Sequence, residues 1–547
     1  LLTSFVDGAI AEQKLTASDA AGGDYFGYSV SLSGDYAVVG AYRDNSQAGS
    51  AYIFVRSGTT WAQQQKLAAP DGAADDHFGK SVALSGDTVI VGAPRSVASG
   101  HQFSMYNSVY DSGYTLGTGR AHVFVRSGTT WTHQQMLADP ENSDNNGGNS
   151  FGMSVALSGD YALIGDGNDE GWGNPNQGAA SVFVRSGTTW TQQQKFHPTH
   201  DGGEQFGFSV SLSGDYALVG APYDNDSEYD GDSYTDGGTH GGSAFVFVRS
   251  GTTWTKQQVL LASDAVKDDS FGYSVSLSGD YALIGAMDDD DDGTSSGSAY
   301  IFVRSGTTWT QQQKLTASDA AGGDYFGYSV SVSGDYAVVG AVRDNSQAGS
   351  AYMFVRSGTT WTQQQKLTVS DAAPNDHFGG SVSVSGNALI GGAHGDNSQA
   401  GSVYIFATHF KDHAALKDAV DNCLAANATG DCDCSSASVD CGAAGSLPIS
   451  QWDTSRVSDM NRLFKNQGSF NANISAWDVS GVTDMTRMFE GANTFAQDIS
   501  SWNVVNVASM DTMFASANAF NAPIGSWNTD GVTNMFQMFH SAHVFDQ

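Results

Sequence analysis

The chain has 547 residues, of which 40% are hydrophobic and 11% aromatic, and this composition excludes a disordered protein. Its 58 acidic residues outnumber 24 Lys and Arg, and the resulting net charge of −34 excludes nucleic acid and anionic membranes as natural partners. No apolar run reaches the roughly 18 residues of a membrane span, so we expect no transmembrane segment in this chain.

A short motif recurs along most of the chain. Phe-Gly pairs open seven similar units, each of which continues through an alternating segment to a run such as "VVGA" or "LIGA". The spacing between pairs varies from 52 to 73 residues, and nearly all of the variation follows that run. The pattern predicts a repeat architecture. The pairs begin at Phe26, Phe78, Phe151, Phe206, Phe271, Phe326 and Phe378.

Each unit reads as four strands, as the first unit illustrates. Residues 28–33 alternate between apolar side chains and serine, which indicates a strand with unlike faces, and residues 36–41 are almost wholly apolar. Residues 50–56 are rich in aromatic and β-branched side chains, whereas residues 61–67 have the polar sequence of an outer edge. The links "SGD" and "SGTT" favour tight antiparallel turns, because glycine adopts the positive φ that they require.

The two ends of this array complement each other. The seventh unit stops after "SVYIFATHF" without a fourth strand, whereas residues 11–15, "AEQKL", supply a fourth strand without a unit of its own. Repeated four-stranded units are typical of a β-propeller. We therefore predict a mainly β fold in which residues 1–408 form a seven-bladed β-propeller closed by strand 11–15.

The repeated segment "FGYSVSLSGDYAVVGA" resembles the FG-GAP repeat of integrin α-chain propellers and of many secreted bacterial and algal proteins. The resemblance extends over residues 11–408 and implies an extracellular recognition or adhesion domain. Integrin-type repeats usually carry a DxDxDG calcium loop between the FG and GAP elements, but only "SGD" stands there in this chain. The integrin calcium sites therefore cannot be transferred to it.

Strand order predicts that all variable connections lie on one face of the propeller, with the monotonous "SGD" and "SGTT" turns on the other. Three variable loops space their oxygen donors like a calcium site, although solvated acidic loops would show the same pattern. We expect this acidic face to attract cations. The candidate calcium ligands are Asp288, Asp290 and Asp292; Asp224, Asp226, Glu228 and Asp230; and Asp166, Asn168 and Glu170.

A linker follows the propeller at residues 409–448. Its first part has the apolar spacing of one amphipathic helix. All cysteines of the chain follow closely, and their CxC spacing favours disulfides over a zinc site with its paired CxxC motifs. The pairing stays open, since four cysteines allow three connectivities. These are Cys423, Cys432, Cys434 and Cys441.

Residues 449–547 have a different rhythm, in which Trp, Met and Phe recur with a period of 25. Such a period predicts a solenoid whose coils bury these side chains against one another, with the preceding helix and cysteines as its cap. The segment "ISAWDVSGVTDMTRMFEGANTFAQD" resembles BspA-like leucine-rich-repeat surface proteins, which implies attachment and extracellular display. We expect the natural chain to continue beyond Gln547, because the last coil would otherwise be uncovered.

Other signals agree with secretion. Glycosylation sequons stand at Asn225, Asn427 and Asn473, and the chain begins without Met, as after removal of a signal peptide. We predict a secreted cell-surface adhesion protein whose acidic face binds a protein, glycan or matrix ligand with calcium as a cofactor. The alternative is a structural subunit that packs head to tail with copies of itself into a filament, sheath or appendage. A carboxylate-based hydrolase is least favoured, because no nucleophile motif is present, and we expect no enzyme.

Overall fold

The computed structural model divides into two compact units, one of residues 12–405 and one of the residues from 406 onward. In the part of the chain that the structure describes, no helix combines the length and apolar character needed to cross a membrane. The described residues are 11–57, 60–96, 118–140, 149–168, 177–198, 205–224, 241–386, 388–407, 413–430, 449–452, 454–455 and 457–546.

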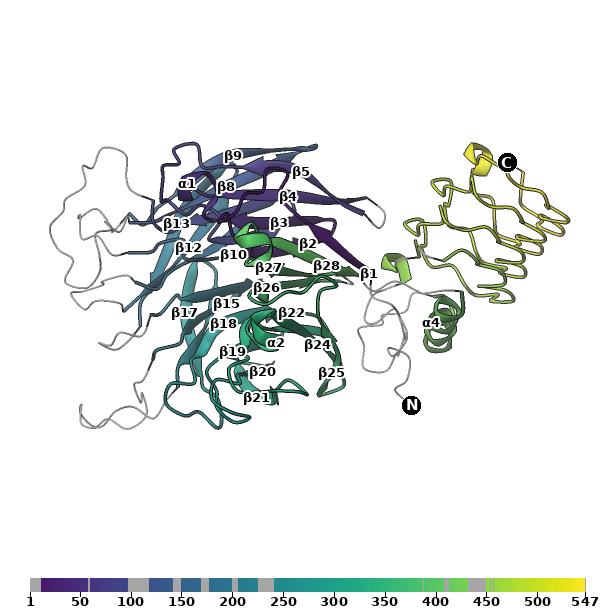
Figure 1. Cartoon of the computed structure of the whole chain (residues 1–547). Helices are drawn as coiled ribbons and strands as arrows, with labels where there is room; N and C mark the ends of the chain where they lie inside the picture. Colours follow the sequence, from purple (N-terminus) through teal and green to yellow (C-terminus); the bar gives the residue numbers. More distant parts are fainter. Residues whose placement is uncertain are drawn as a thin grey trace. The chain divides into compact units, whose positions relative to one another are not determined.

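The first unit consists of seven antiparallel four-stranded sheets, the blades of a β-propeller (Figure 1). The first strand of each blade contacts the first strands of its neighbours, so these strands lie innermost. The strands are, for blade 1, β2 (Phe26–Ser33), β3 (Tyr36–Ala41), β4 (Ser50–Ser57) and β5 (Thr60–Leu67); for blade 2, β6 (Ser81–Ser85), β7 (Thr88–Ala93), β8 (Arg120–Ser127) and β9 (Thr130–Leu137); for blade 3, β10 (Ser154–Ser158), β11 (Tyr161–Asp166), β12 (Ala179–Ser186) and β13 (Thr189–Phe196); for blade 4, β14 (Ser209–Ser213), β15 (Tyr216–Ala221), β16 (Ser243–Ser250) and β17 (Thr253–Leu260); for blade 5, β18 (Phe271–Ser278), β19 (Tyr281–Ala286), β20 (Ser298–Ser305) and β21 (Thr308–Leu315); for blade 6, β22 (Phe326–Ser333), β23 (Tyr336–Ala341), β24 (Ser350–Ser357) and β25 (Thr360–Leu367); and for blade 7, β26 (Phe378–Ser385), β27 (Ala388–Ala393), β28 (Ser402–Ala407) and β1 (Ala11–Leu15).

Strand β1 is the outermost strand of blade 7, where it pairs with β28. In Figure 1 the purple N-terminal strand accordingly lies beside the green strands of the last blade. The predicted seven blades and their closure by the N-terminal strand are therefore confirmed. The closed ring leaves no unpaired blade edge between the two ends of the array.

The hydrophobic cores lie between neighbouring blades. Ile53 and Leu67 of blade 1, for example, pack with Phe78 and Val91 of blade 2. The Phe-Gly pair lies at the boundary between two blades, because the main chain of Phe78 forms a parallel bridge with Gly49 of the preceding blade. Gly79 follows with φ +90°, and a Cβ there would lie 2.3 Å from the carbonyl oxygen of Ser50, so only glycine fits.

The polar fourth strands join the blades to one another. A β-bulge opposite Ile53 and Phe54 makes Gln64 an extra residue, and Gln64 and Gln65 then both reach Trp131 of the next blade. The amide of Gln65 accepts a hydrogen bond from the Trp131 N–H (2.8 Å) and donates one to its carbonyl oxygen (2.7 Å). We call such a pair a glutamine clip. The described clips are Gln13–Trp61, Gln65–Trp131, Gln135–Trp190, Gln194–Trp254, Gln258–Trp309 and Gln313–Trp361.

On the face with the monotonous turns, arginine and aspartate side chains form ion pairs within the blades. In blades 1 to 6, an arginine near the end of the third strand pairs with the aspartate of the "SGD" turn in the same blade. Each of these cations also lies near an aromatic ring, as Arg126 does over Tyr36 at 4.5 Å. The pairs are Arg56–Asp35, Arg126–Asp87, Arg185–Asp160, Arg249–Asp215, Arg304–Asp280 and Arg356–Asp335.

The opposite face carries the connections between blades and the variable loops between second and third strands. Three of these loops have the same sequence and form a short left-handed turn, in which Asn45, for example, has φ 52°. Figure 1 labels two of these turns, α1 and α2. Their bounds are α1 (Asp44–Gln47), α2 (Asp344–Gln347) and α3 (Asp396–Gln399).

The second unit is a stack of coils with a 25-residue register. Parallel bridges link Asp459 to Asp484, Asp484 to Ser509 and Ser509 to Asn534. Phenylalanine rings stack in the same register, with Phe464 and Phe489 centroids 5.5 Å apart and nearly parallel. The coils contain the short 3-10 helices η3 (Ile449–Gln451) and η4 (Ile524–Ser526). The predicted Trp, Met and Phe columns are thus core residues.

Helix α4 (His413–Ala426) shares this core. Its Leu416 and Val420 are buried with Trp452 of the first coil. Cys423 is disulfide-bonded. Cys432, Cys434 and Cys441 lie outside the described residues, so the predicted pairing is untested.

Candidate functional site

The predicted calcium loop of blade 5 is arranged differently from the expected alternation. The Asp288 carboxylate accepts a hydrogen bond from the Ser270 hydroxyl (2.8 Å), and that of Asp290 accepts the Ser295 N–H (2.7 Å). Asp292 donates its own N–H to Ser296. The carboxylates of Asp288 and Asp290 thus accept hydrogen bonds from different partners.

The intervening aspartates of this loop converge on a lysine. The Lys314 ammonium lies 2.9 Å from Asp264, 2.9 Å from Asp289 and 2.5 Å from Asp291. The Tyr300 hydroxyl also donates to Asp289 (2.7 Å). Burial opposes the charge of Lys314, but its hydrogen bonds with the three carboxylates raise its pKa. A side-chain cation therefore occupies the centre of this carboxylate cluster.

The same device recurs around the ring. The lysine before the last residue of the fourth strand pairs with an aspartate from the preceding link and, in blades 1, 6 and 7, with a second aspartate from the variable loop. Sequence reasoning missed it, although the recurring "QQQK" was its signal. The contacts are Lys14–Asp371 and Lys14–Asp396, Lys66–Asp19 and Lys66–Asp44, Lys366–Asp319 and Lys366–Asp344, and Lys195–Asp139, all between 2.5 and 2.7 Å.

The other two predicted calcium loops are only partly described. Asp166 accepts the Ser150 N–H (2.6 Å), and Asn168 donates to the Ser150 hydroxyl (2.7 Å). Asp224 accepts the Ser243 hydroxyl. Within the described ranges no three His, Cys, Asp or Glu side chains are grouped as metal ligands, and calcium binding stays a prediction. Asp226, Glu228, Asp230 and Glu170, like the sequon at Asn225, lie outside those ranges.

A different group of side chains surrounds the propeller axis on the variable-loop face. Because the first strands are innermost, the residues beside their Phe-Gly pairs meet there across blade boundaries. We call the part contributed by blades 7, 1 and 2 the axial mouth. It consists of Tyr25, Tyr28, Tyr42, Arg43, His77, Lys80, Arg95, His377 and His394.

Aromatic contacts make the axial mouth continuous. Tyr42 contacts Tyr28 (4.6 Å between centroids) and His77 (5.0 Å). His394 contacts Tyr25 (5.8 Å, nearly parallel) and His377 (5.1 Å). The rings therefore form one surface from blade 7 to blade 2.

Cations lie on these rings. The Lys80 ammonium is 4.0 Å from the Tyr28 centroid and donates to the Tyr28 hydroxyl (2.7 Å), while the Arg43 guanidinium is 4.6 Å from the Tyr25 centroid. Arg95 lies nearby and is exposed. In the described part of the chain none of these three cations has a carboxylate in an ion pair. The predicted acidity of the face as a whole stays a prediction, and several aspartates further out pair with lysines.

The imidazoles of the axial mouth are neutral. Burial, with the charges of Arg95 and Lys80, lowers the pKa of His77 to about 3. Burial, with His377 and Lys80, likewise lowers the pKa of His394 to about 3. The Nδ1 atom of His394 is buried and has no hydrogen-bond partner among the described groups. These rings therefore offer neutral donors and acceptors.

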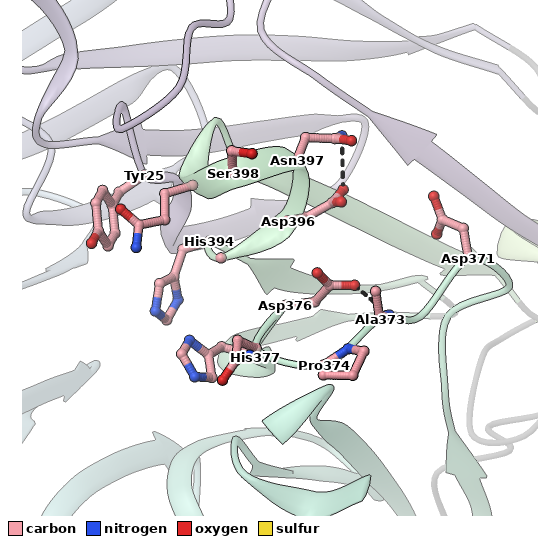
Figure 2. A pocket seen from close by; sticks show the side chains of 13 residues that line it. Tyr25, Asp371, Ala373, Pro374, Asp376, His377, His394, Asp396, Asn397 and Ser398 are labelled. Atoms are coloured by element: carbon pink, nitrogen blue, oxygen red, sulfur yellow. Dashed lines mark hydrogen bonds between the residues drawn. The ribbon is translucent and has the colours of Figure 1, made fainter. Parts of the chain in front are cut away.

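A groove of about 1000 Å³ extends outward from the axial mouth across blade 7 (Figure 2). At its inner end His377 faces His394, with Tyr25 beside them. Its outer end holds Asp371 and Asp396, which share an ion pair with the single Lys14. Amide and hydroxyl side chains line the length between, from Asn375, Asn397, Ser398 and Gln399.

In comparison with known families, each unit matches a family description. The description "FG-GAP repeat" matches residues 10–54, 61–110, 131–183, 190–247, 254–302, 309–354 and 361–406. Residues 432–547 match "Mycoplasma protein of unknown function, DUF285". No curated protein matches the chain.

Proposed function

The chain belongs to the FG-GAP repeat family, and from that premise we propose that it is an extracellular adhesion and recognition protein. FG-GAP propellers suggest a recognition-type module, and such repeats are typical of extracellular proteins. We propose that the variable-loop face binds the ligand and that the protein is not an enzyme. We further propose that the C-terminal coils form a leucine-rich-repeat solenoid for surface display, with N-glycans at Asn427 and Asn473.

The observation that carries this proposal is the contrast between the two propeller faces. One face repeats an internal arginine–aspartate pair in six blades. The other gathers aromatic rings, neutral imidazoles and unpaired cations at the axial mouth. Charged and aromatic groups left without internal partners are typical of binding surfaces rather than of packing.

The proposal can be tested by blocking each face in turn. Ala21 is exposed on the variable-loop face beside blade 7, and Ser127 is exposed at the end of β8 on the opposite face. A polyethylene glycol chain coupled to Ala21→Cys should abolish binding of the full chain to cell surfaces and extracellular matrix. The same group on Ser127→Cys should leave binding intact. Equal inhibition from both positions would contradict the proposal.

A structural role in a polymer is the second candidate, and the regularity of the propeller favours it. Residues 12–61 and 312–361 are nearly identical, and one face repeats the same arginine–aspartate pair in six blades, which suits a building block that packs with copies of itself. Sedimentation of purified full chain should reveal concentration-dependent polymers. A monomer at all concentrations would refute this role.

A further inference from the structure

Blade 7 differs from blades 1 and 6 at the positions that surround the axis. All three blades share the turn sequence Asp-Asn-Ser-Gln and its left-handed geometry. Blade 6 has Tyr325 before its Phe-Gly pair, Tyr328 after it, and Val342 and Arg343 after its second strand. Blade 7 has His377, Gly380, His394 and Gly395 at the same positions.

These exchanges open the groove. In blade 6 the Arg343 guanidinium covers Tyr325, 4.5 Å from the ring centroid, whereas Gly395 has no side chain to cover His377. Gly380 leaves room for the inward-lying His394, since a Cβ there would be 3.0 Å from the His394 ring. The groove is thus built by residue differences specific to one blade.

The lining of the groove has the chemistry of a sugar site. The Arg43 guanidinium and the His394 ring lie against Tyr25, and the two imidazoles, the amides and Ser398 offer neutral donors and acceptors. Sugar hydroxyls require many such bonds. The unpartnered Nδ1 of His394 is free to accept a hydroxyl proton.

The charges at the inner end specify the kind of sugar. Arg43 covers the outer side of Tyr25, and Lys80 lies on Tyr28 close enough to His394 to affect its pKa. Both cations lack a carboxylate within the described residues, in a chain of net charge −34 whose other propeller arginines and lysines are mostly paired. The net charge of the chain disfavours general attraction of anions, so these two cations favour an anionic partner that binds locally.

We propose that the blade 7 groove binds an acidic sugar, with its carboxylate or sulfate group at Arg43 and Lys80 and its hydroxyls at the imidazoles and amides of the groove. This inference rests on the proposed function, because it names the ligand class of the same face. Three carboxylates also line the groove, and within the described residues none of them forms an ion pair with Arg43 or Lys80. Asp371 and Asp396 share the single Lys14 at the far end, and Asp376 accepts the Ala373 N–H at 2.6 Å.

The test measures binding of the full chain to size-matched oligogalacturonate, sulfated dextran, unmodified dextran and polyglutamate by calorimetry. We expect binding to at least one of the two acidic sugars and none to dextran or polyglutamate. Arg43→Gln should weaken binding about tenfold, the effect of one charge-assisted hydrogen bond. Lys267→Gln is the control, because Lys267 is exposed in the link before blade 5 and does not line the groove. It should change binding less than twofold.

A second variant fills the groove with side chains that already occur at the same positions of blade 6. His377→Tyr, Gly380→Tyr and His394→Val together give blade 7 three of the four blade 6 residues, and we expect loss of sugar binding with an unchanged melting temperature. Uronate-only or sulfate-only binding identifies the source of the charge and supports the proposal. Equal binding of dextran, binding of polyglutamate, or insensitivity to Arg43→Gln would overturn it. If no sugar binds but the Ala21→Cys conjugate still loses cell-surface binding, this inference fails while the proposed function stands.

Discussion

The glutamine clip at Gln13 gives a direct test of how the propeller closes. The Gln13 amide donates to the Trp61 carbonyl oxygen (2.8 Å) and accepts the Trp61 N–H (2.9 Å), and it thereby joins β1 to blade 1. Each bond contributes about 1 kcal/mol, and Trp61 is buried, so its main-chain groups would lose both partners. Gln13→Ala should therefore lower the free energy of unfolding of the propeller by about 2 to 3 kcal/mol.

The matched control is Gln194→Ala, which removes the equivalent clip to Trp254 (2.8 and 3.0 Å) between two blades that are joined through the chain. Urea unfolding followed by tryptophan fluorescence should give the same loss for both variants, since tryptophan is present at both seams. A neutral Gln13→Ala variant beside a destabilised Gln194→Ala variant would refute the closure. It would mean that the N-terminal strand leaves the ring in solution.

Three further predictions concern the titrating groups. Lys314→Met should lower the free energy of unfolding by about 3 kcal/mol, because it leaves the buried carboxylate of Asp289 beside two other carboxylates without a cation. Calcium should then raise the melting temperature of this variant more than that of the parent protein or of the exposed control Lys267→Met. Burial raises the pKa of Asp269 to about 6, so the free energy of unfolding falls as the pH rises from about 4 to about 6. Asp269→Asn should therefore stabilise the protein by about 2 kcal/mol at pH 8, a value reduced for solvent screening, and should have no effect at pH 4. Thermal unfolding at the two pH values measures the difference. Because His77 has a pKa of about 3, the affinity for the acidic sugar should change little between pH 7.5 and about 5.5. A tenfold higher affinity at the lower pH, measured by calorimetry, would assign the anion contact to a protonated histidine instead.

Much of the propeller could be predicted from one sequence, because every blade repeats the same sequence motifs. The Phe-Gly pair, the apolar second strand and the missing fourth strand of the seventh unit are local signals, and they place β1 in blade 7. The role of the fourth strands was not predictable in the same way. Simple alternation puts Gln64 and Gln65 on opposite sides, and only the bulge opposite Ile53 and Phe54 turns both toward the next blade.

The calcium loops show a second limit of local reasoning. The spacing of Asp288, Asp290 and Asp292 suits a cation, but the turn engages Asp288 and Asp290 with nearby serines. The neighbouring aspartates then meet Lys314, which lies 23 residues beyond Asp291 in the sequence. A lysine at the end of another strand is not part of any loop motif, so the neutralised cluster was missed.

The axial mouth was missed for a related reason. Tyr25, His77 and His394 come from three blades, and no spacing within the chain brings them together. A signal did exist, since the position after the Phe-Gly pair varies between Tyr28, Lys80 and Gly380 while its surroundings repeat. Variation at one column of an otherwise regular repeat indicates a site where blades have diverged for recognition.

Hydrogen exchange of the full chain with and without a bound acidic oligosaccharide tests the central claim most directly. The account predicts slower exchange in residues 42–49, 371–377 and 394–401, which surround the axial mouth and the groove. Exchange at the turns of the opposite face, such as those holding Arg126 and Arg249, should not change. Protection confined to those turns or to the C-terminal coils would contradict recognition through the variable-loop face.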